Sequence, residues 1–395
     1  MTHADPLLSI LIPTKDRYET LIPVVSQIAS RIVDPRLEIV ICDNSADRPA
    51  ALDDLIASDR RIRYHHTELP LSIVDNTQLG IDLCRGTYLC FIGDDDLVSP
   101  HIMAIVEWLD RLGESCLVYP PALYWWSSVQ FAKPGRYLRP GAFWLPKMRQ
   151  GEDRPLDAAG ELAKVLARGG VAYMELPRLY HGIVSRRAME RLKNRFGRFV
   201  PGSSPDMALS IALALTGNRY RWINYPVTVF GAARNSGGGR TAARKHYGRI
   251  EDQSHLPADI LTHWDPFLPR IWSEQIIYPQ TVYEVMSRGG FPNRINYPSL
   301  YGSLIAYEPH IVPYLWPALR RYISEHPGDA PALLISVMKK LAGRLRTELR
   351  NRAGWGMNYE VSIRQDVADV MTLLEGVMLP STVMEIQVRD SLIPE

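Results

Sequence analysis

Short apolar runs and stretches of helical spacing alternate along the first 120 residues. The runs at 7–13, 37–42 and 87–92 are rich in residues that favour β-structure and predict buried strands. Between them, apolar residues recur every three or four positions at 21–32 and 73–83, as in amphipathic helices. Strands that alternate with helices predict a mainly parallel sheet covered on both faces. The expected fold class is therefore α/β.

The pattern changes after residue 120. Residues 120–175 hold large aromatic side chains among prolines and glycines, and we expect most of them to form a local core, with stacking on sugar rings as the alternative. The spacing then predicts a strand and a helix over 180–195, a helix over 205–215, a strand over 219–230 and a mobile polar loop at 235–239. From about residue 251 the pattern is helical and punctuated by prolines.

Composition narrows the class of protein. The 395 residues can form two or three domains, and a formal net charge of +2 gives no case for nucleic-acid binding. The four cysteines lie in apolar surroundings without a CxxC pair, which predicts buried thiols in a cytoplasmic protein rather than zinc or redox sites. The chain shows neither a signal-peptide pattern near residue 1 nor a long apolar stretch that predicts a membrane span.

Three aspartates, Asp94, Asp95 and Asp96, follow the strand at 87–92. Carboxylates this close need a compensating positive charge, and a hard divalent metal with phosphate oxygens as further ligands would supply it. Ligands of open α/β sheets bind at the carboxyl ends of the strands, where these residues are expected. The alternative is a solvated acidic turn.

Four segments together form a pattern. They are residues 10–14, 41–45, 76–86 and 93–96, and residues 84–88 lead into the strand before the last of them. Their order and spacing resembles the family 2 glycosyltransferases of the GT-A fold, over residues 7–112 and less closely over 180–240. The resemblance implies a GT-A (Rossmann-like) domain at 1–250, with a nucleotide-binding half (1–120) and an acceptor half (121–250), followed by a helical C-terminal domain at 251–395.

The resemblance also implies a nucleotide-sugar donor, most simply a UDP-sugar. Asp43 would accept the imide N–H of uracil, although an aspartate at a strand end also caps turns. Asp95 would hold the ribose or the metal, and Asp96 would ligate Mn²⁺ or Mg²⁺. Gly93 stands where many relatives carry another aspartate, so Asp94 could share that role. The implied nucleotide-binding residues are Pro13, Thr14, Asp16, Arg17, Asp43, Asn76, Asp94 and Asp95.

An inverting transfer needs a base that takes the proton of the acceptor hydroxyl. Asp206 matches the aspartate that the family places at the start of a helix, with Pro205 in place of the usual glutamate. The alternative for Asp206 is helix capping. Weaker rivals for the base are Asp157, Glu161 and Glu175.

The glycine-rich segment 231–240 follows the predicted strand at 219–230. Arg234 and Arg240 would bind the diphosphate there, as the resemblance implies, with a solvated loop as the alternative. The histidine usual in relatives is missing from its place. His246 or His181 would substitute as a ligand, although a lone histidine is more often structural.

In the last third, leucines and Met338 form one helical face between residues 334 and 349, and basic residues cover much of the rest. We expect the leucines to pack in a helical bundle, with contact to an anionic membrane as the alternative.

The sequence thus predicts an inverting, metal-dependent glycosyltransferase that acts on a glycan or lipid-linked glycan acceptor of bacterial surface polysaccharide. It would work in the cytoplasm or at the inner face of the membrane. The alternatives are a sugar-nucleotide pyrophosphorylase, whose Gly-rich phosphate loop is replaced here by residues 13–17, and a non-catalytic glycan- or nucleotide-binding relative.

Overall fold

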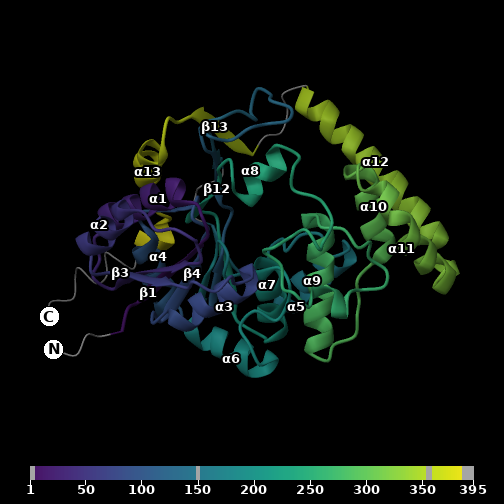
Figure 1. Cartoon of the computed structure of the whole chain (residues 1–395), viewed down its shortest axis with the longest axis horizontal. Coiled ribbons are helices and arrows are strands. Elements are labelled where there is room, and N and C mark those ends of the chain that lie inside the picture. Colours follow the sequence, from purple (N-terminus) through teal and green to yellow (C-terminus); the bar gives the residue numbers. More distant parts are fainter. Residues whose placement is uncertain (1–4, 148–151, 353–357, 385–395) are drawn as a thin grey trace.

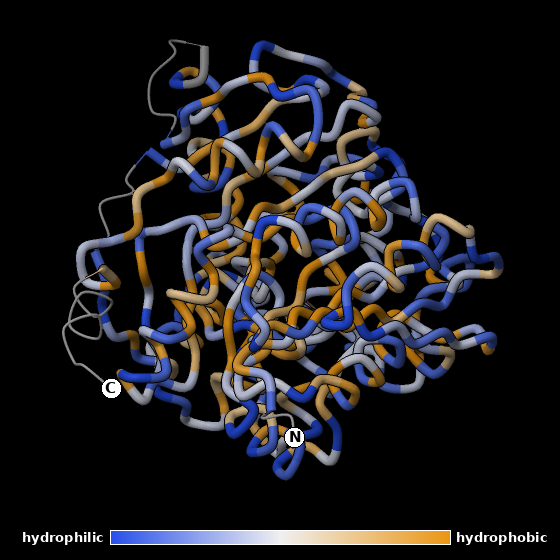
Figure 2. The backbone as a smooth tube through the Cα atoms, turned by 90° about the vertical axis from the view of Figure 1, so that its left-hand side faces the viewer, coloured by the Kyte–Doolittle hydropathy of each residue, from blue (hydrophilic) through white to orange (hydrophobic). Residues whose placement is uncertain are grey.

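The computed structural model describes residues 5–147, 152–352 and 358–384. Two β-sheets lie at the centre, with helices around them (Figure 1). Apolar segments run through the interior and polar ones gather at the periphery (Figure 2). The strands and helices of the first 120 residues are β1 (Leu8–Thr14), α1 (Tyr18–Arg31), β2 (Leu37–Asp43), α2 (Ala50–Ser58), β3 (Ile62–His66), α3 (Ile73–Leu83), β4 (Tyr88–Phe91), β5 (Leu97–Val98), α4 (Ile102–Arg111) and β6 (Cys116–Val118).

The larger sheet has eight strands in the order β3-β2-β1-β4-β10-β6-β11-β9. β1 pairs in parallel with both β2 and β4, and β2 pairs in parallel with β3. The chain builds outward from β1 to β3 and then crosses to β4 on the other side of β1. This reversal creates a switch point between β1 and β4, where open α/β sheets bind ligands. The predicted α/β class is confirmed.

The remaining elements of the larger sheet and the helices that cover it come from residues 153–223. They are β9 (Asp153–Leu156), α5 (Ala158–Ala167), β10 (Ile183–Ser185), α6 (Arg186–Phe196), α7 (Pro205–Leu215) and β11 (Tyr220–Ile223). β10 lies antiparallel to β4 and β6, and it separates the parallel strands β3, β2, β1 and β4 from the parallel pair β6 and β11. α7 has the bounds predicted from its spacing.

The aromatic segment after residue 120 forms most of a second sheet, in the order β13-β8-β7-β12-β5. Its strands include β7 (Ala122–Trp125), β8 (Ala142–Pro146) and β12 (Thr228–Ala232). Tyr124 and Phe143 are fully buried here, which confirms the local-core interpretation for them. The strand predicted over 219–230 is two strands, β11 and β12, in different sheets.

In the described residues after 251, most of the chain is helical. The elements of this part are η1 (Ile260–His263), α9 (Glu274–Arg288), α10 (Tyr297–Tyr307), α11 (Val312–Glu325), η2 (Pro327–Asp329) and α12 (Ala330–Arg352). Buried residues of α9 and α10, such as Ile276 and Leu300, share one core with Val165 of α5 and Leu209 of α7. The helices after residue 251 and the helices α5 and α7 are therefore packed together.

The helical pattern expected to the end of the chain is interrupted. Residues 359–363 form β13 (Tyr359–Ile363), which pairs with β8, and α13 (Val367–Glu375) packs beside α1 (Figure 1). The free edge of β8 supplies hydrogen-bond partners for β13, and the apolar face of α13, with Met371, joins the N-terminal core. The segment expected in a C-terminal helical domain thus returns to the α/β part.

Candidate active site

The three aspartates lie at the switch point between β1 and β4, and all are buried. The Thr14 hydroxyl donates a hydrogen bond of 2.6 Å to Oδ2 of Asp94. The Arg17 guanidinium forms an ion pair with the same oxygen at 3.0 Å. The loop after β1 therefore contacts the acidic turn directly, as the register of parallel strands requires.

Asp96 has protein partners on both carboxylate oxygens. Oδ2 accepts hydrogen bonds from the backbone N–H of Gly93 (2.6 Å) and the hydroxyl of Tyr180 (3.1 Å), and it lies 2.9 Å from His181 Nε2. Oδ1 accepts from the backbone N–H of Gly231 at 2.6 Å. Three of these contacts fall on Oδ2 and one on Oδ1, where an acceptor site remains. Asp96 therefore holds the acidic turn to Gly93, Tyr180, His181 and Gly231.

The His181 ring is also held by protein contacts. Its Nδ1 lies 2.7 Å from the Thr228 hydroxyl, while its Nε2 faces Asp96. Both ring nitrogens therefore contact the protein, which supports the structural interpretation of this histidine.

The segment after β12 lies directly over the acidic turn. The backbone N–H of Ala233 donates to Oδ2 of Asp95 at 2.9 Å, and the indole of Trp126 donates to the Asp95 carbonyl at 2.8 Å. A Cβ on Gly231 would lie 1.7 Å from that carbonyl oxygen, so only glycine permits this close approach. The start of the glycine-rich segment is thus fixed to Asp95.

Burial makes the charges of this turn costly. It raises the pKa of Asp94 to about 6, against the opposing effect of Arg17, and the pKa of Asp95 to about 7, where Asp96 adds to the shift. Burial also acts on Asp96, but His181 and hydrogen bonds outweigh it and hold that pKa below its usual value. Oδ1 of Asp94 is buried without a hydrogen-bond partner. The positive charge that the protein itself supplies therefore does not fully compensate Asp94 and Asp95.

A complete metal site is not formed by protein groups alone. Within residues 5–147, 152–352 and 358–384, no group of three or more His, Cys, Asp or Glu side chains could hold a metal ion. Asp94 and Asp95 would supply two carboxylates, and other ligands would have to come from a bound molecule.

Asp43 is buried at the end of β2. Its Oδ2 accepts hydrogen bonds from the hydroxyls of Tyr18 (2.6 Å) and Tyr64 (2.8 Å), and its Oδ1 accepts from the Ser45 backbone N–H (2.8 Å). The turn-capping role is therefore present. Three accepted bonds leave a carboxylate about one free acceptor site.

Two other predicted residues connect neighbouring loops. The backbone N–H of Asp16 donates to Ser45 Oγ at 2.7 Å, and the Asp16 carboxylate accepts from Ala46. The Asn76 side chain donates to the Cys42 carbonyl at 3.2 Å, while its own Oδ1 is buried without a partner. Both residues hold the β1 and β2 loops in place at the site.

Asp206 stands in the first turn of α7, directly after Pro205. Its Oδ1 accepts hydrogen bonds from the Ser204 hydroxyl and, at 2.9 Å, from the Met207 backbone N–H. Its Oδ2 accepts from the Tyr278 hydroxyl of α9. Asp206 therefore has a local capping role and also contacts the helical part of the chain.

Tyr180 is affected by both the acidic turn and Asp206. It donates to Asp96, and after burial the charges of Asp96, Asp95 and Asp206 all contribute to raising its pKa. The charges of Asp206 and of two aspartates of the acidic turn, Asp95 and Asp96, thus act on the same side chain.

The rivals to Asp206 have partners of their own. Asp157 caps α5 through the backbone N–H groups of Ala159 and Gly160. Glu161 pairs with Lys164, and Glu175 pairs with Arg154.

Glu274, the first residue of α9, is a site residue that the sequence analysis missed. Burial, and then the charge of Asp206, raise its pKa to about 7. It lies one helical turn before Tyr278, which donates to Asp206. Since this part of the chain does not match the family pattern, no motif drew attention to it.

Arg234 and Arg240 lie exposed in the segment after Ala233. The predicted mobile loop is partly a short helix, α8 (Gly237–Ala242), which Ser236 caps by accepting from the Gly239 N–H. Burial, then the positive charges of His255 and Arg240, lower the pKa of His246 to about 4. His246 also lies 3.2 Å from the Thr241 hydroxyl.

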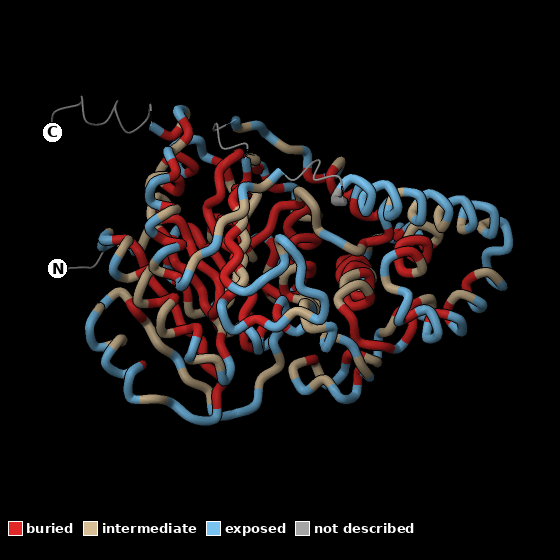
Figure 3. Tube along the Cα trace, turned by 90° about the horizontal axis from the view of Figure 1, so that it is seen from above, coloured by how far each residue is buried: buried red, intermediate tan, exposed pale blue. Residues whose placement is uncertain are grey.

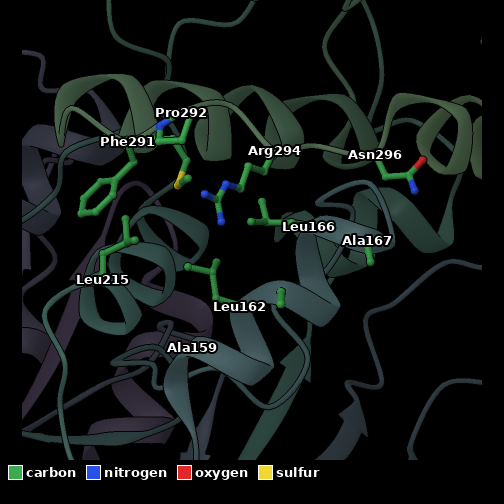
Figure 4. Close-up of a pocket in the computed structure, with 11 residues that line it drawn as sticks. Ala159, Leu162, Leu166, Ala167, Leu215, Phe291, Pro292, Arg294 and Asn296 are labelled. Carbon is green, nitrogen blue, oxygen red and sulfur yellow. The ribbon is translucent and has the colours of Figure 1, made fainter.

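A groove of about 430 Å³ lies elsewhere, between α5 and residues 291–296 (Figure 4). Its lining is mostly apolar, including Leu162, Leu215 and Phe291. None of the predicted site residues lines it.

Comparison with known proteins gives a family match and several distant similarities. Residues 9–161 match the family model described as glycosyl transferase family 2. A curated relative, the uncharacterized protein y4gI of Sinorhizobium fredii (strain NBRC 101917 / NGR234), is 27% identical over 124 residues. That match spans 29% of this chain and 14% of the relative.

Solved structures of S. aureus TarS are also similar. TarS 1–349 in complex with UDP-GlcNAc has 14% identity and a TM-score of 0.49, covering 92% of this chain and 97% of that one. A longer TarS structure has 12% identity and a TM-score of 0.40, covering 57% of this chain and 37% of that one. In the described residues, no helix is both long and apolar enough to cross a membrane. The matched residues 9–161 contain β1, β2 and the acidic turn, so the part of this chain that is similar to glycosyl transferase family 2 is the part that carries the predicted donor site.

Proposed function

We propose that the chain is an inverting, metal-dependent glycosyltransferase that moves a sugar from a UDP-linked donor to a hydroxyl of a glycan acceptor. One observation carries the proposal. Tyr180 donates a hydrogen bond to Asp96, and the charges of Asp96, Asp95 and, from the start of α7, Asp206 all help to raise its pKa. This supports a site at which a donor-binding group and a proton acceptor work together.

The donor would bind across the ends of β1 and β2. The remaining acceptor site of Asp43 suits the imide N–H of a uracil base, between the loops that Asp16 and Asn76 hold in place. Pro13 and Thr14 at the end of β1 would lie beside the nucleotide. Arg17, already paired with Asp94, supplies positive charge at the point where a diphosphate would enter.

The unpaired Oδ1 of Asp94 and the raised pKa of Asp95 fit a divalent cation, Mn²⁺ or Mg²⁺. In this proposal Asp94 and Asp95 hold the cation, and Asp96 positions them through its bonds to Gly93 and Gly231. This differs from the expectation that Asp96 is itself the ligand. When bound, such a cation neutralises charge on the departing diphosphate.

Asp206 would act as the base. Its carboxylate takes the proton of the acceptor hydroxyl as that oxygen attacks the anomeric carbon from the side opposite the leaving nucleotide. Tyr278 and Ser204 fix the orientation of the carboxylate. Arg234 and Arg240 lie on the segment fixed to Asp95, from which they would reach the diphosphate.

The acceptor would be a growing or lipid-linked glycan of a bacterial surface polysaccharide, met at the inner face of the membrane. This assignment is supported by the family resemblance alone.

A donor screen tests the proposal. The purified chain is incubated with a panel of nucleotide sugars, with Mn²⁺, with Mg²⁺ or with chelator, and released nucleotide is measured. We expect release from a UDP-sugar that depends on the metal and is lost in Asp95→Asn. The matched control is Asp157→Asn, which alters an exposed helix cap of α5. Release that is equal in chelator, or greater with guanine nucleotides, would contradict the proposal.

A further inference from the structure

Helix α12 exposes a continuous apolar face. Figure 3 shows it as a long, largely exposed helix along one edge of the molecule. The side chains of this face are 46 to 63% exposed, whereas the sequence predicted that its leucines would be packed in a bundle. They are Leu334, Ile335, Met338, Leu341, Leu345 and Leu349.

The face is a single stripe. At about 100° per residue these six positions fall within an arc of about 120° on the helix surface. The other side of α12 packs on α10 through small residues: a Cβ on Gly302 would lie 2.2 Å from Ser336 Oγ. Arg344 anchors the helix by donating to the Ala306 carbonyl at 2.5 Å. Because α12 already has its packing partner, the leucine side remains uncovered in the described structure.

Charge identifies what would cover this face. Residues 330–352 contain six basic residues and one acidic residue, Glu348. Lys339, Arg346 and Arg350 border the apolar stripe on one side, by the same helical spacing. Two copies of such a helix would repel each other, whereas a bilayer with anionic headgroups matches both the apolar stripe and the positive border.

We propose that α12 lies on an anionic membrane surface, with its apolar stripe in the boundary between headgroups and acyl chains. The proposal does not rest on the proposed function, because vesicle binding is measured without turnover. It gives the chain a means to meet a substrate held in a membrane.

Vesicle sedimentation of the full chain tests this. We expect binding to vesicles of phosphatidylcholine with 30% phosphatidylglycerol, and little binding to phosphatidylcholine alone. Each basic residue near the surface contributes about fivefold to the partition coefficient, so Lys339→Glu with Arg346→Glu should reduce it at least tenfold. Leu341→Ser with Leu345→Ser should reduce it by at least as much. Val33→Ser is the matched control, since Val33 is 84% exposed on the loop after α1.

Two results would overturn the proposal. One is equal vesicle binding by the wild type and both double variants, with folding verified by circular dichroism. The other is a dimer in sedimentation velocity that the Leu341→Ser, Leu345→Ser variant disperses, since a second copy would then cover the face.

Discussion

Glu274 offers a test of the electrostatics of the site that does not require a substrate. Its carboxylate is held at the start of α9, close to Asp206, and its pKa is raised from an ordinary 4.5 to about 7 by burial and by that charge. Between these values the folded chain keeps a proton on Glu274 that the unfolded chain has released. The contribution of Glu274 to stability therefore falls as the pH rises from about 4.5 to about 7.

The size of the effect follows from the shift. One pKa unit corresponds to about 1.4 kcal/mol, so a shift from 4.5 to about 7 makes the ionised carboxylate cost about 3 kcal/mol of folding stability above pH 7. Glu274→Gln keeps the shape of the side chain but cannot ionise. We expect the variant to be more stable than the wild type by about 3 kcal/mol at pH 8 and nearly equal to it at pH 5.

The assay is urea unfolding followed by circular dichroism at both pH values. Glu190→Gln, on the exposed side of α6, is the control and should show no difference at either pH. A Glu274→Gln variant whose stability difference from the wild type does not change with pH would refute the reasoning. So would a variant that is less stable than the wild type at pH 8.

Three further predictions follow from the hydrogen bonds and contacts of the site. Asp43→Ala should weaken UDP binding by about 1.5–3 kcal/mol, measured by calorimetry, and equal affinity would remove Asp43 from the donor site. Asp96→Ala should lower the free energy of unfolding by roughly 3–5 kcal/mol, because Gly93, Gly231 and His181 lose a buried acceptor. A variant with the same melting temperature as the wild type would contradict this structural role of Asp96. Gly231→Ala should lower the free energy of unfolding in urea by about 1–3 kcal/mol or more, since its Cβ would meet the Asp95 carbonyl. In the control Gly135→Ala, the Cβ would have no atom within 4 Å, and the free energy of unfolding should change by less than about 0.5 kcal/mol.

The part of the fold built from local pattern was predictable. α3 and α7 have the bounds that their spacing predicted. β2 and β4 coincide with two of the predicted apolar runs, and Asp43 and Asp94 stand at or just after the ends of these strands. Those runs are short, strongly apolar and buried on both faces, which makes parallel strands readable from sequence.

The parts that depend on distant partners were not predictable. β13 is a strand because β8 offers a free edge more than 200 residues earlier in the chain, and β9 pairs with β11 although it is polar and contains Pro155. The exposed face of α12 has the same spacing as a packed one, so only the structure shows that it is uncovered.

The site, too, has features that the sequence predicted and features that depend on distant contacts. The sequence placed Thr14, Asp43 and the three aspartates together through the order of strands, but it could not tell which carboxylate oxygens were already taken by protein groups. The contacts of Asp96 with Tyr180 and His181 come from a segment 85 residues away that carries no motif. Glu274 and Tyr278 reach Asp206 only through the packing of α9 against α7.

The central claim is that Asp206 is the base of a transfer reaction at the site formed by the three aspartates. The most direct measurement compares Asp206→Asn with the wild type, with UDP affinity measured by calorimetry and sugar transfer or donor hydrolysis measured by nucleotide release. Asparagine keeps the size and the capping ability of the side chain but takes no proton at neutral pH. The account predicts unchanged UDP affinity with a rate reduced by about 10²–10⁴-fold. A rate close to that of the wild type at unchanged affinity would leave Asp206 as a helix cap and contradict the account.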